Sequence, residues 1–247
     1  MTILLLFVFG LCVGSFCNVL IYRLPKQEDF VRTPSHCMYC GHPLRWFELI
    51  PLVSWLIQGG KCRSCGHKLS CQYPLVEALN GLLWALTGLL FPGDLVTVAL
   101  YCGFTSLLIV LAVIDWRTYE IPNGINLSIF VLGLIRLFTD LDRAAFYLIG
   151  MCSVSLVFLL LWAATRGNGL GMGDVKLMAA AGLLLGWPNM ILATLVGSLS
   201  GSVIHLWRMR RGAGHKLAFG PYLAFGLWVS ALFGPGLISA YLGLFGL

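Results

Sequence analysis

The chain has 247 residues, of which 59% are hydrophobic and 11% are charged, and its mean hydropathy is +0.89. This small number of polar side chains cannot cover the surface of a folded chain of this length. The composition therefore excludes a water-soluble globular protein. The net charge of +6 does not require nucleic acid, because basic loops of a membrane protein meet anionic lipid head groups. We expect an all-α polytopic membrane protein that contacts membrane lipid and no nucleic acid.

Apolar stretches long enough to cross a bilayer recur along the chain. A helix of about 20 residues spans roughly 30 Å of hydrocarbon. The first stretch has no basic residue in front and is followed by Arg23 and Lys26, which is typical of an anchor and not of a cleaved signal peptide. The sequence predicts about eight transmembrane helices, at residues 3–22, 74–92, 95–115, 121–138, 144–164, 175–187, 190–207 and 219–246.

These stretches divide the chain into three expected parts. Residues 1–23 form the first transmembrane helix, 24–73 a polar loop domain, and 74–247 a transmembrane bundle. All Lys and Arg residues except Arg136 and Arg143 lie in the loops and helix ends at 23–73, 115–121, 165–176 and 208–216. Because cytoplasmic loops are enriched in these residues, we predict both termini outside the cell membrane and the 24–73 loop in the cytoplasm.

The polar loop contains two C-x-x-C motifs, Cys37 with Cys40 and Cys62 with Cys65. Each motif lets two thiolates hold one ion from a tight turn, and two motifs complete the tetrahedral four-sulfur site that zinc favours. Cytoplasmic thiols stay reduced, which argues against two disulfides. We predict a structural zinc ion that staples this loop domain; unliganded or redox-active thiols are the alternative. Three histidines are less favoured replacement ligands: His36, His42 and His67.

Asp115 and Asp174 lie at the end of the third predicted span and the start of the sixth, both on the cytoplasmic side. Ionisable residues bordering a span are functional candidates, and two carboxyl groups that meet can serve as acid and base. Each alone has a structural explanation: Asp174 as a helix N-cap, Asp115 as an interfacial charge beside Arg117. The flexible backbone of Gly171 and Gly173 before Asp174 can approach a substrate. We predict that the two aspartates form a catalytic pair.

Seven stretches and the C-x-x-C pair resemble the type IV prepilin peptidases, also called leader peptidase/N-methyltransferases, over nearly the whole chain. The resemblance places that family's two catalytic aspartates on Asp115 and Asp174. It implies a bacterial inner-membrane aspartic endopeptidase, with periplasmic termini, that removes the basic leader from type IV prepilins or type II secretion pseudopilins. The stretches are 14–25 (GSFCNVLIYRLP), 48–55 (ELIPLVSW), 60–65 (GKCRSC), 73–77 (YPLVE), 115–123 (DWRTYEIPN), 171–178 (GMGDVKLM) and 219–224 (FGPYLA).

The resemblance also implies methylation of the new N-terminus, with S-adenosylmethionine as the methyl donor. The glycine run at 167–173 lacks the preceding strand of a nucleotide-binding fingerprint. The zinc loop, with Trp46, Glu48 and Trp55, is a candidate for part of the donor site, but the sequence identifies no donor-binding residue. Glu77 is explained as a first-turn carboxylate favoured by the helix dipole, and a role in a polar cavity is the alternative.

Three other functions are compatible with parts of the sequence. An intramembrane protease of the presenilin or signal-peptide-peptidase type would keep both aspartates but would cut inside a transmembrane helix and gives no reason for the zinc loop. A proton-coupled transporter would use Asp115 and Asp174 as ion sites. An assembly scaffold built on the zinc loop would function without either aspartate.

Overall fold

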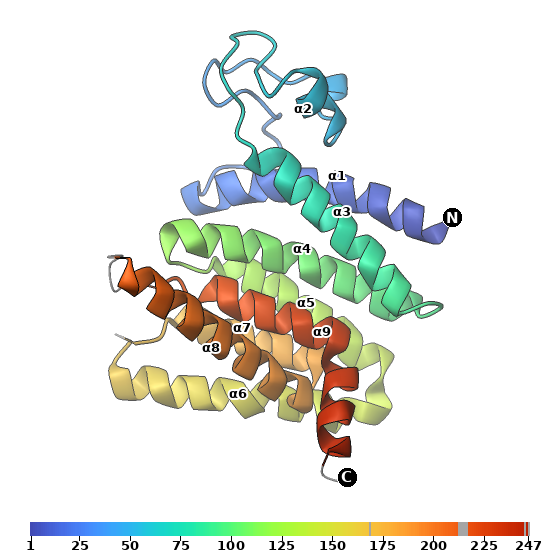
Figure 1. Ribbon diagram of the computed structural model, residues 1–247, viewed down its shortest axis with the longest axis vertical. Coiled ribbons are helices and arrows are strands. Elements are labelled where there is room, and N and C mark those ends of the chain that lie inside the picture. The colour runs from blue at the N-terminus through green and yellow to red at the C-terminus, as the bar shows by residue number, and fades with distance from the viewer. Residues whose placement is uncertain (168, 212–216, 245, 247) are drawn as a thin grey trace. The chain divides into compact units, whose positions relative to one another are not determined.

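The computed structural model describes residues 1–167, 169–211, 217–244 and 246. Over these residues every regular element is a helix, as Figure 1 shows. The β-type pairings found there are two isolated bridges in the polar loop, His36 with Pro43 and Lys61 with Lys68. The all-α architecture that the sequence predicts is confirmed.

The chain divides into two compact units, Met1–Val110 and Leu111–Leu247, and helix α4 continues from the first into the second. The first unit contains α1 (Thr2–Arg23), η1 (Leu24–Lys26), η2 (Trp46–Glu48), α2 (Val53–Ile57), α3 (Gln72–Leu90) and most of α4 (Leu95–Thr118). The second contains the end of α4, α5 (Asn123–Thr139), η3 (Leu141–Arg143), α6 (Ala144–Thr165), α7 (Met172–Leu185), α8 (Trp187–Arg210) and α9 (Gly220–Gly243).

Each of the eight apolar stretches predicted to cross the membrane corresponds to a helix. Within the described residues, α1, α3, α4, α6, α8 and α9 are long and apolar enough to span a bilayer. Helices α5 and α7 are shorter, with 17 and 14 residues, so the total of eight spans remains a prediction. The start of α7 differs from the expected position, since the helix begins at Met172 and Asp174 lies inside it.

In the first unit, α1 and α3 pack closely because glycines lie at their contact. A Cβ on Gly10 would lie 2.8 Å from the Cα of Gly81. A Cβ on Gly14 would lie 2.8 Å from the Cα of Glu77. Small residues of this kind let membrane helices approach each other. The side chain of Asn80 then reaches across and donates to the carbonyl oxygen of Gly10 at 2.7 Å, which satisfies a polar group that is fully buried.

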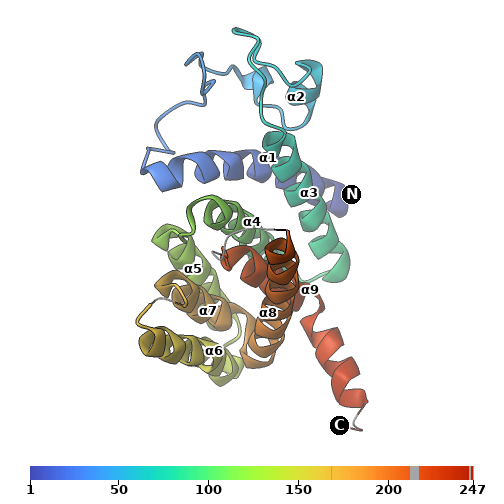
Figure 2. The same cartoon turned by 60° about the vertical axis from the view of Figure 1, so that its left-hand side comes forward.

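In the second unit, α7 lies between α5 and α6, as Figure 2 shows. Ten of its 14 residues are buried, so α7 contacts protein over most of its surface. Its closest contact is with α6, where a Cβ on Gly182 would overlap the carbonyl oxygen of Gly150, and a Cβ on Gly150 would overlap that of Gly182. This contact holds the helix that carries Asp174 in one position along α6.

We expect Gly182→Leu to lower the free energy of unfolding by about 1–3 kcal/mol or more, because the added side chain meets the backbone of α6 and no rotamer avoids it. The matched control is Gly236→Leu on α9, where an added Cβ has no atom within 4 Å. Thermal unfolding of both variants in detergent checks this. Equal melting temperatures for the two variants would contradict the close packing of α6 and α7.

Candidate active site and metal centre

Asp115 lies near the end of α4 and is 5% exposed. Its Oδ2 accepts a hydrogen bond of 2.8 Å from the backbone N–H of Gly220, the first residue of α9. A Cβ on Gly220 would lie only 2.7 Å from the same oxygen, so this contact requires glycine. The N–H groups at a helix start lack partners within the helix and carry a partial positive charge. The start of α9 therefore stabilises the buried carboxylate.

Asp174 is the third residue of α7 and is 8% exposed. The residue that caps the helix is Gly171, so the interpretation of Asp174 as the N-cap is wrong. Its backbone N–H donates to the Gly171 carbonyl at 3.1 Å, and its Oδ2 accepts from the Gly171 N–H at 3.2 Å. This reciprocal pair closes the first turn of α7. It uses one lone pair of the carboxylate.

The two carboxylates are both buried and belong to the same compact unit. Like charges that interact in a buried place are stabilised when one proton is shared between them. Such a pair titrates as a unit and contains an acid and a base together. The fold therefore places both predicted partners in the interior of one compact unit.

Asn126 on α5 is a site residue that the sequence analysis did not identify. It is 5% exposed, and its Nδ2 donates to the carbonyl oxygen of Gly173 at 3.2 Å. Its Oδ1 is buried without a partner among the described residues. Asn126 therefore ties the residue before Asp174 to α5 and has an acceptor available. In the sequence, Asn126 stands out as a polar amide about one turn from the start of an apolar stretch.

Lys176 also connects α7 to α5. Its side chain is exposed, and its Nζ donates to Oδ1 of Asn123 at 2.9 Å. Asn123 is the first residue of α5, so the start of α5 is attached to the first turns of α7 by two side-chain bonds, this one and that of Asn126. These bonds position the backbone on which Asp174 is mounted.

The four loop cysteines form one cluster in the first unit. The Sγ atoms of Cys37, Cys40, Cys62 and Cys65 all lie within 4.8 Å of one another, and Cys37 and Cys62 are buried. This donor set fits a four-sulfur zinc site, whose ligands fill the tetrahedron and leave no position for a reacting water. Among the described residues the cluster contains these cysteines alone, without His36, His42 or His67.

Both C-x-x-C motifs have the same local structure. The N–H of Cys37 donates to His42 O at 2.9 Å, and that of Cys62 to His67 O at 2.8 Å. The first turn, Cys37 to His42, contains Gly41 at φ 70°, and the second, Cys62 to His67, contains Gly66 at φ 71°. Both have a left-handed conformation that favours glycine. The backbone N–H groups of Cys65 and Ser64 point at the Cys62 sulfur and lower the pKa of that thiol to about 7, which favours the thiolate that binds metal.

Comparison with known proteins gives a consistent assignment along the chain. Residues 8–91 match the bacterial peptidase A24 N-terminal domain, and residues 102–206 match the type IV leader peptidase family. Three similar proteins are each named prepilin leader peptidase/N-methyltransferase. The protein of Pectobacterium carotovorum subsp. carotovorum is 39% identical over 89% of this chain and 88% of its own length. That of Bacillus subtilis (strain 168) is 36% identical over 96% and 97%, and that of Pseudomonas aeruginosa 35% over 94% and 91%. No solved structure matches the chain.

We expect Cys62→Ser to reduce the zinc bound by the purified protein to well below one ion per chain, because a hydroxyl is a poor replacement for a thiolate ligand. Cys71→Ser is the matched control, since Cys71 is an exposed thiol of the same loop region outside the cluster. Elemental analysis of both variants and the unchanged chain measures the metal. An unchanged chain that is folded and contains no zinc would refute the prediction.

Proposed function

Because the chain belongs to the type IV leader peptidase family, we propose that it is a membrane aspartic endopeptidase that removes the basic leader of type IV prepilins or type II secretion pseudopilins. The observation that carries this proposal is the pair of buried carboxylates, Asp115 and Asp174, which lie in one compact unit. Membership of the family and several membrane-length helices support a multi-pass protein of the bacterial inner membrane.

The proposed mechanism uses one ionised and one protonated aspartate. The ionised carboxylate takes a proton from water, whose oxygen attacks the carbonyl carbon of the scissile peptide bond, while the protonated carboxyl donates to the carbonyl oxygen. The carbon–nitrogen bond then breaks, and the leaving amine takes a proton from the pair. The backbone N–H groups of Gly220 and Gly171 hold both carboxylates without a full positive charge, so a proton can pass between them.

The proposed site of cleavage is the cytoplasmic face of the membrane. Asp115 is followed within a few residues by the end of α4, and Asp174 lies in the first turn of α7, so both are near loops that can admit water. The excess of basic residues in these loops and in the 24–73 loop supports a cytoplasmic location for them, with both termini in the periplasm. The apolar helix of the substrate would lie in lipid beside the bundle, with its basic leader in the cytoplasm.

We also propose that the chain methylates the new N-terminus with S-adenosylmethionine as the donor, and that Cys37, Cys40, Cys62 and Cys65 hold a structural zinc ion. The names of the similar proteins include N-methyltransferase, which supports the second activity. The four-sulfur cluster supports the zinc site. A metal there would bind the two C-x-x-C turns together and would contribute to the folding of the loop.

One experiment tests both activities. The purified chain in detergent is incubated with a prepilin and S-adenosylmethionine, and the product is analysed by mass spectrometry. We expect the product to lose the mass of the leader and then to gain the mass added when one methyl group replaces a hydrogen. Cleavage inside the transmembrane helix would favour an intramembrane protease, and ion flux across vesicles without cleavage would favour a transporter.

We expect Asp115→Asn and Asp174→Asn each to lower the rate of cleavage by about a thousand-fold or more, because an amide of nearly the same size cannot cycle a proton. Insertion into the membrane should be unchanged. Asp142→Asn, on the exposed turn η3, is the matched control and should cleave normally. Cleavage by both catalytic-pair variants at rates near that of the unchanged chain would disprove the aspartic mechanism.

Cleavage at the membrane surface also predicts a dependence on the depth of the scissile bond. Extending the apolar helix of the substrate on its N-terminal side by about two turns, roughly 11 Å, should move the bond away from the aspartates and reduce cleavage sharply. The residues around the bond stay unchanged, so sequence recognition is preserved. A polar extension of the same length is the control. Undiminished cleavage of the apolar variant would instead support a protease that works within the bilayer.

A further inference from the structure

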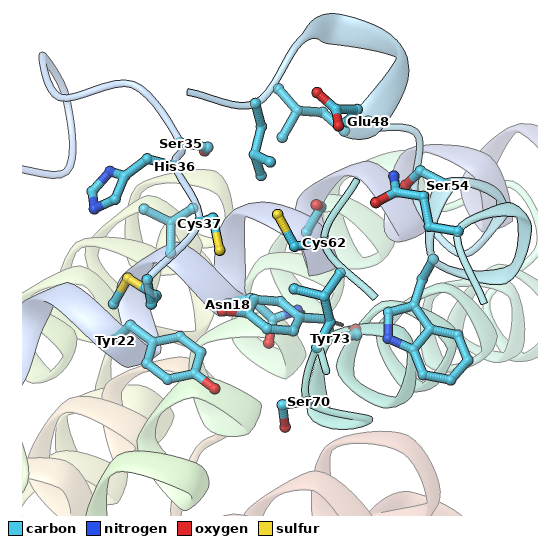
Figure 3. A pocket seen from close by; sticks show the side chains of 18 of the residues that line it. Asn18, Tyr22, Ser35, His36, Cys37, Glu48, Ser54, Cys62, Ser70 and Tyr73 are labelled. Atoms are coloured by element: carbon cyan, nitrogen blue, oxygen red, sulfur yellow. Dashed lines mark hydrogen bonds between the residues drawn. The ribbon is translucent and has the colours of Figure 1, made fainter. Parts of the chain in front are cut away.

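A cavity of about 350 Å³ lies in the first compact unit, and its wall is formed by α1, α3 and the 24–73 loop, as Figure 3 shows. Its volume falls in the range of small-molecule sites, roughly 300–1,000 Å³. The wall includes Cys37 and Cys62 of the cysteine cluster. Neither Asp115 nor Asp174 lines the cavity, and the peptidase mechanism gives its lining residues no role.

The cavity contains a buried carboxylate that has no cationic partner. Glu77, on α3, is 6% exposed and lines the cavity. Its Oε2 accepts from the backbone N–H of Leu52 at 2.8 Å. No ion pair with Glu77 occurs in the described part of the chain. A buried charge held only by neutral donors is costly, and a positively charged ligand would offset that cost.

The backbone at Leu52, which donates to Glu77, is strained. Leu52 has φ 60°, a left-handed value that is unfavourable for leucine. Such strain persists where the surrounding structure requires it and is frequent at functional sites. Here it turns the N–H of Leu52 toward the carboxylate and places the short helix α2, which begins at the next residue, against the cavity.

Arg23 is the buried basic residue of the cavity wall, and it does not form an ion pair with Glu77. Arg23 is 6% exposed, and its guanidinium donates to three loop carbonyls, those of Asp29, Thr33 and Pro34, at 2.7–3.0 Å. It therefore holds the start of the loop in place. Lys68, which also lines the cavity, is exposed and solvated. Among the described residues, Glu77 is therefore the buried carboxylate of the wall that is held by a backbone N–H and not by a cation.

Trp55, on α2, adds an unused donor. Its side chain lines the cavity, and its Nε1 is buried without a partner among the described residues. An indole N–H can only donate, and a buried donor without an acceptor is costly. Gly60 leaves room for the ring, because a Cβ there would lie only 2.9 Å from it. A ligand with an acceptor atom would satisfy this group.

Aromatic rings form a further part of the wall. Tyr22 of α1 and Tyr73 of α3 stack with ring centroids 5.5 Å apart and planes at 22°, and both line the cavity. Aromatic faces bind planar bases by stacking and attract cations through their electron-rich surfaces. The cavity thus combines a buried anion, a buried donor and aromatic surfaces.

We propose that this cavity is the binding site of the methyl donor, S-adenosylmethionine, whose sulfonium cation, planar base and polar acceptors match these three features. Glu77 faces the positive charge, Trp55 donates to an acceptor, and the tyrosines contact the base. This inference rests on the proposed methyltransferase function. In the reaction the neutral α-amine of the cut substrate forms a bond to the methyl carbon, and the carbon–sulfur bond breaks with its electrons remaining on sulfur. The methylated ammonium returns one proton to water.

The location of the cavity explains what the cysteine cluster contributes. Cys37 and Cys62 are buried in the wall, so the metal that they would hold shapes the cavity while taking no part in the transfer. Glu48, another lining residue, is committed to the loop, since its Oε2 accepts from the N–H of Arg45 at 2.9 Å. Trp46 is 77% exposed and is not part of the wall, so of the three loop residues considered from the sequence for the donor site, Glu48 and Trp55 line the cavity.

The test measures equilibrium binding of radiolabelled S-adenosylmethionine to the purified full chain in detergent, without substrate. We expect Glu77→Gln and Trp55→Phe each to weaken binding by about ten-fold or more, as the loss of one buried polar contact to a ligand predicts. Both variants should still remove the leader. The matched controls are Glu28→Gln and Trp46→Phe, which change exposed residues outside the cavity and should bind the donor normally.

The outcomes separate this inference from the proposed function. If the unchanged chain transfers methyl groups and both cavity variants bind the donor as it does, the donor site lies elsewhere and the inference is overturned. Parallel loss of binding and cleavage in both variants would also overturn it, because general misfolding predicts that result. If the unchanged chain cleaves prepilin but neither binds the donor nor transfers a methyl group, the proposed second activity fails together with this site.

Discussion

Placing two carboxylates inside an apolar helical bundle is the constraint on which the candidate active site depends. Each charge loses its water and needs donors from the protein. Asp115 and Asp174 obtain them from backbone N–H groups of glycines at helix starts, Gly220 and Gly171. A lysine or arginine in these positions would hold both groups ionised, whereas amides stabilise the charge and leave one proton available for sharing. The proposed ability of the pair to share a proton therefore follows from the backbone N–H groups that stabilise its buried charge.

The second compact unit keeps these helix starts in place through close contacts between backbones. Gly150 and Gly182 bring α6 and α7 so near that no side chain fits between them. Asn126 bonds to the residue before Asp174, and Gly220 leaves room for the Asp115 carboxylate. In a bilayer, lipid tails are as apolar as leucine, so helices associate through such contacts and through hydrogen bonds. Precise positions of the aspartates result from small residues more than from large apolar ones.

The first unit is stabilised differently, because its 24–73 loop has little apolar core. The four cysteines bring two distant turns together in one cluster, and Arg23 adds three bonds to loop carbonyls. These attachments allow strain at Leu52 and an unpaired donor at Trp55 to persist. Unsatisfied groups of this kind are rare in native structures. The unpaired donor of Trp55 and the buried carboxylate of Glu77 line the same cavity, which distinguishes it from an apolar packing defect.

The sequence by itself determined the class of the protein, because a mean hydropathy of +0.89 and repeated apolar stretches of 20 residues leave only a helical membrane fold. It also identified the four cysteines, since metal sites built from two short motifs depend on spacing within each motif. It identified both aspartates as candidates from their type and position. The tertiary structure decided what a linear pattern cannot contain: that Asp174 lies in the first turn of α7, that Gly220 bonds to Asp115 and Asn126 to the residue before Asp174, and that Glu77, Trp55 and two tyrosines meet around a cavity. These contacts join residues far apart in the chain, and they depend on which helix faces pack together, a choice made by shape complementarity between whole helices.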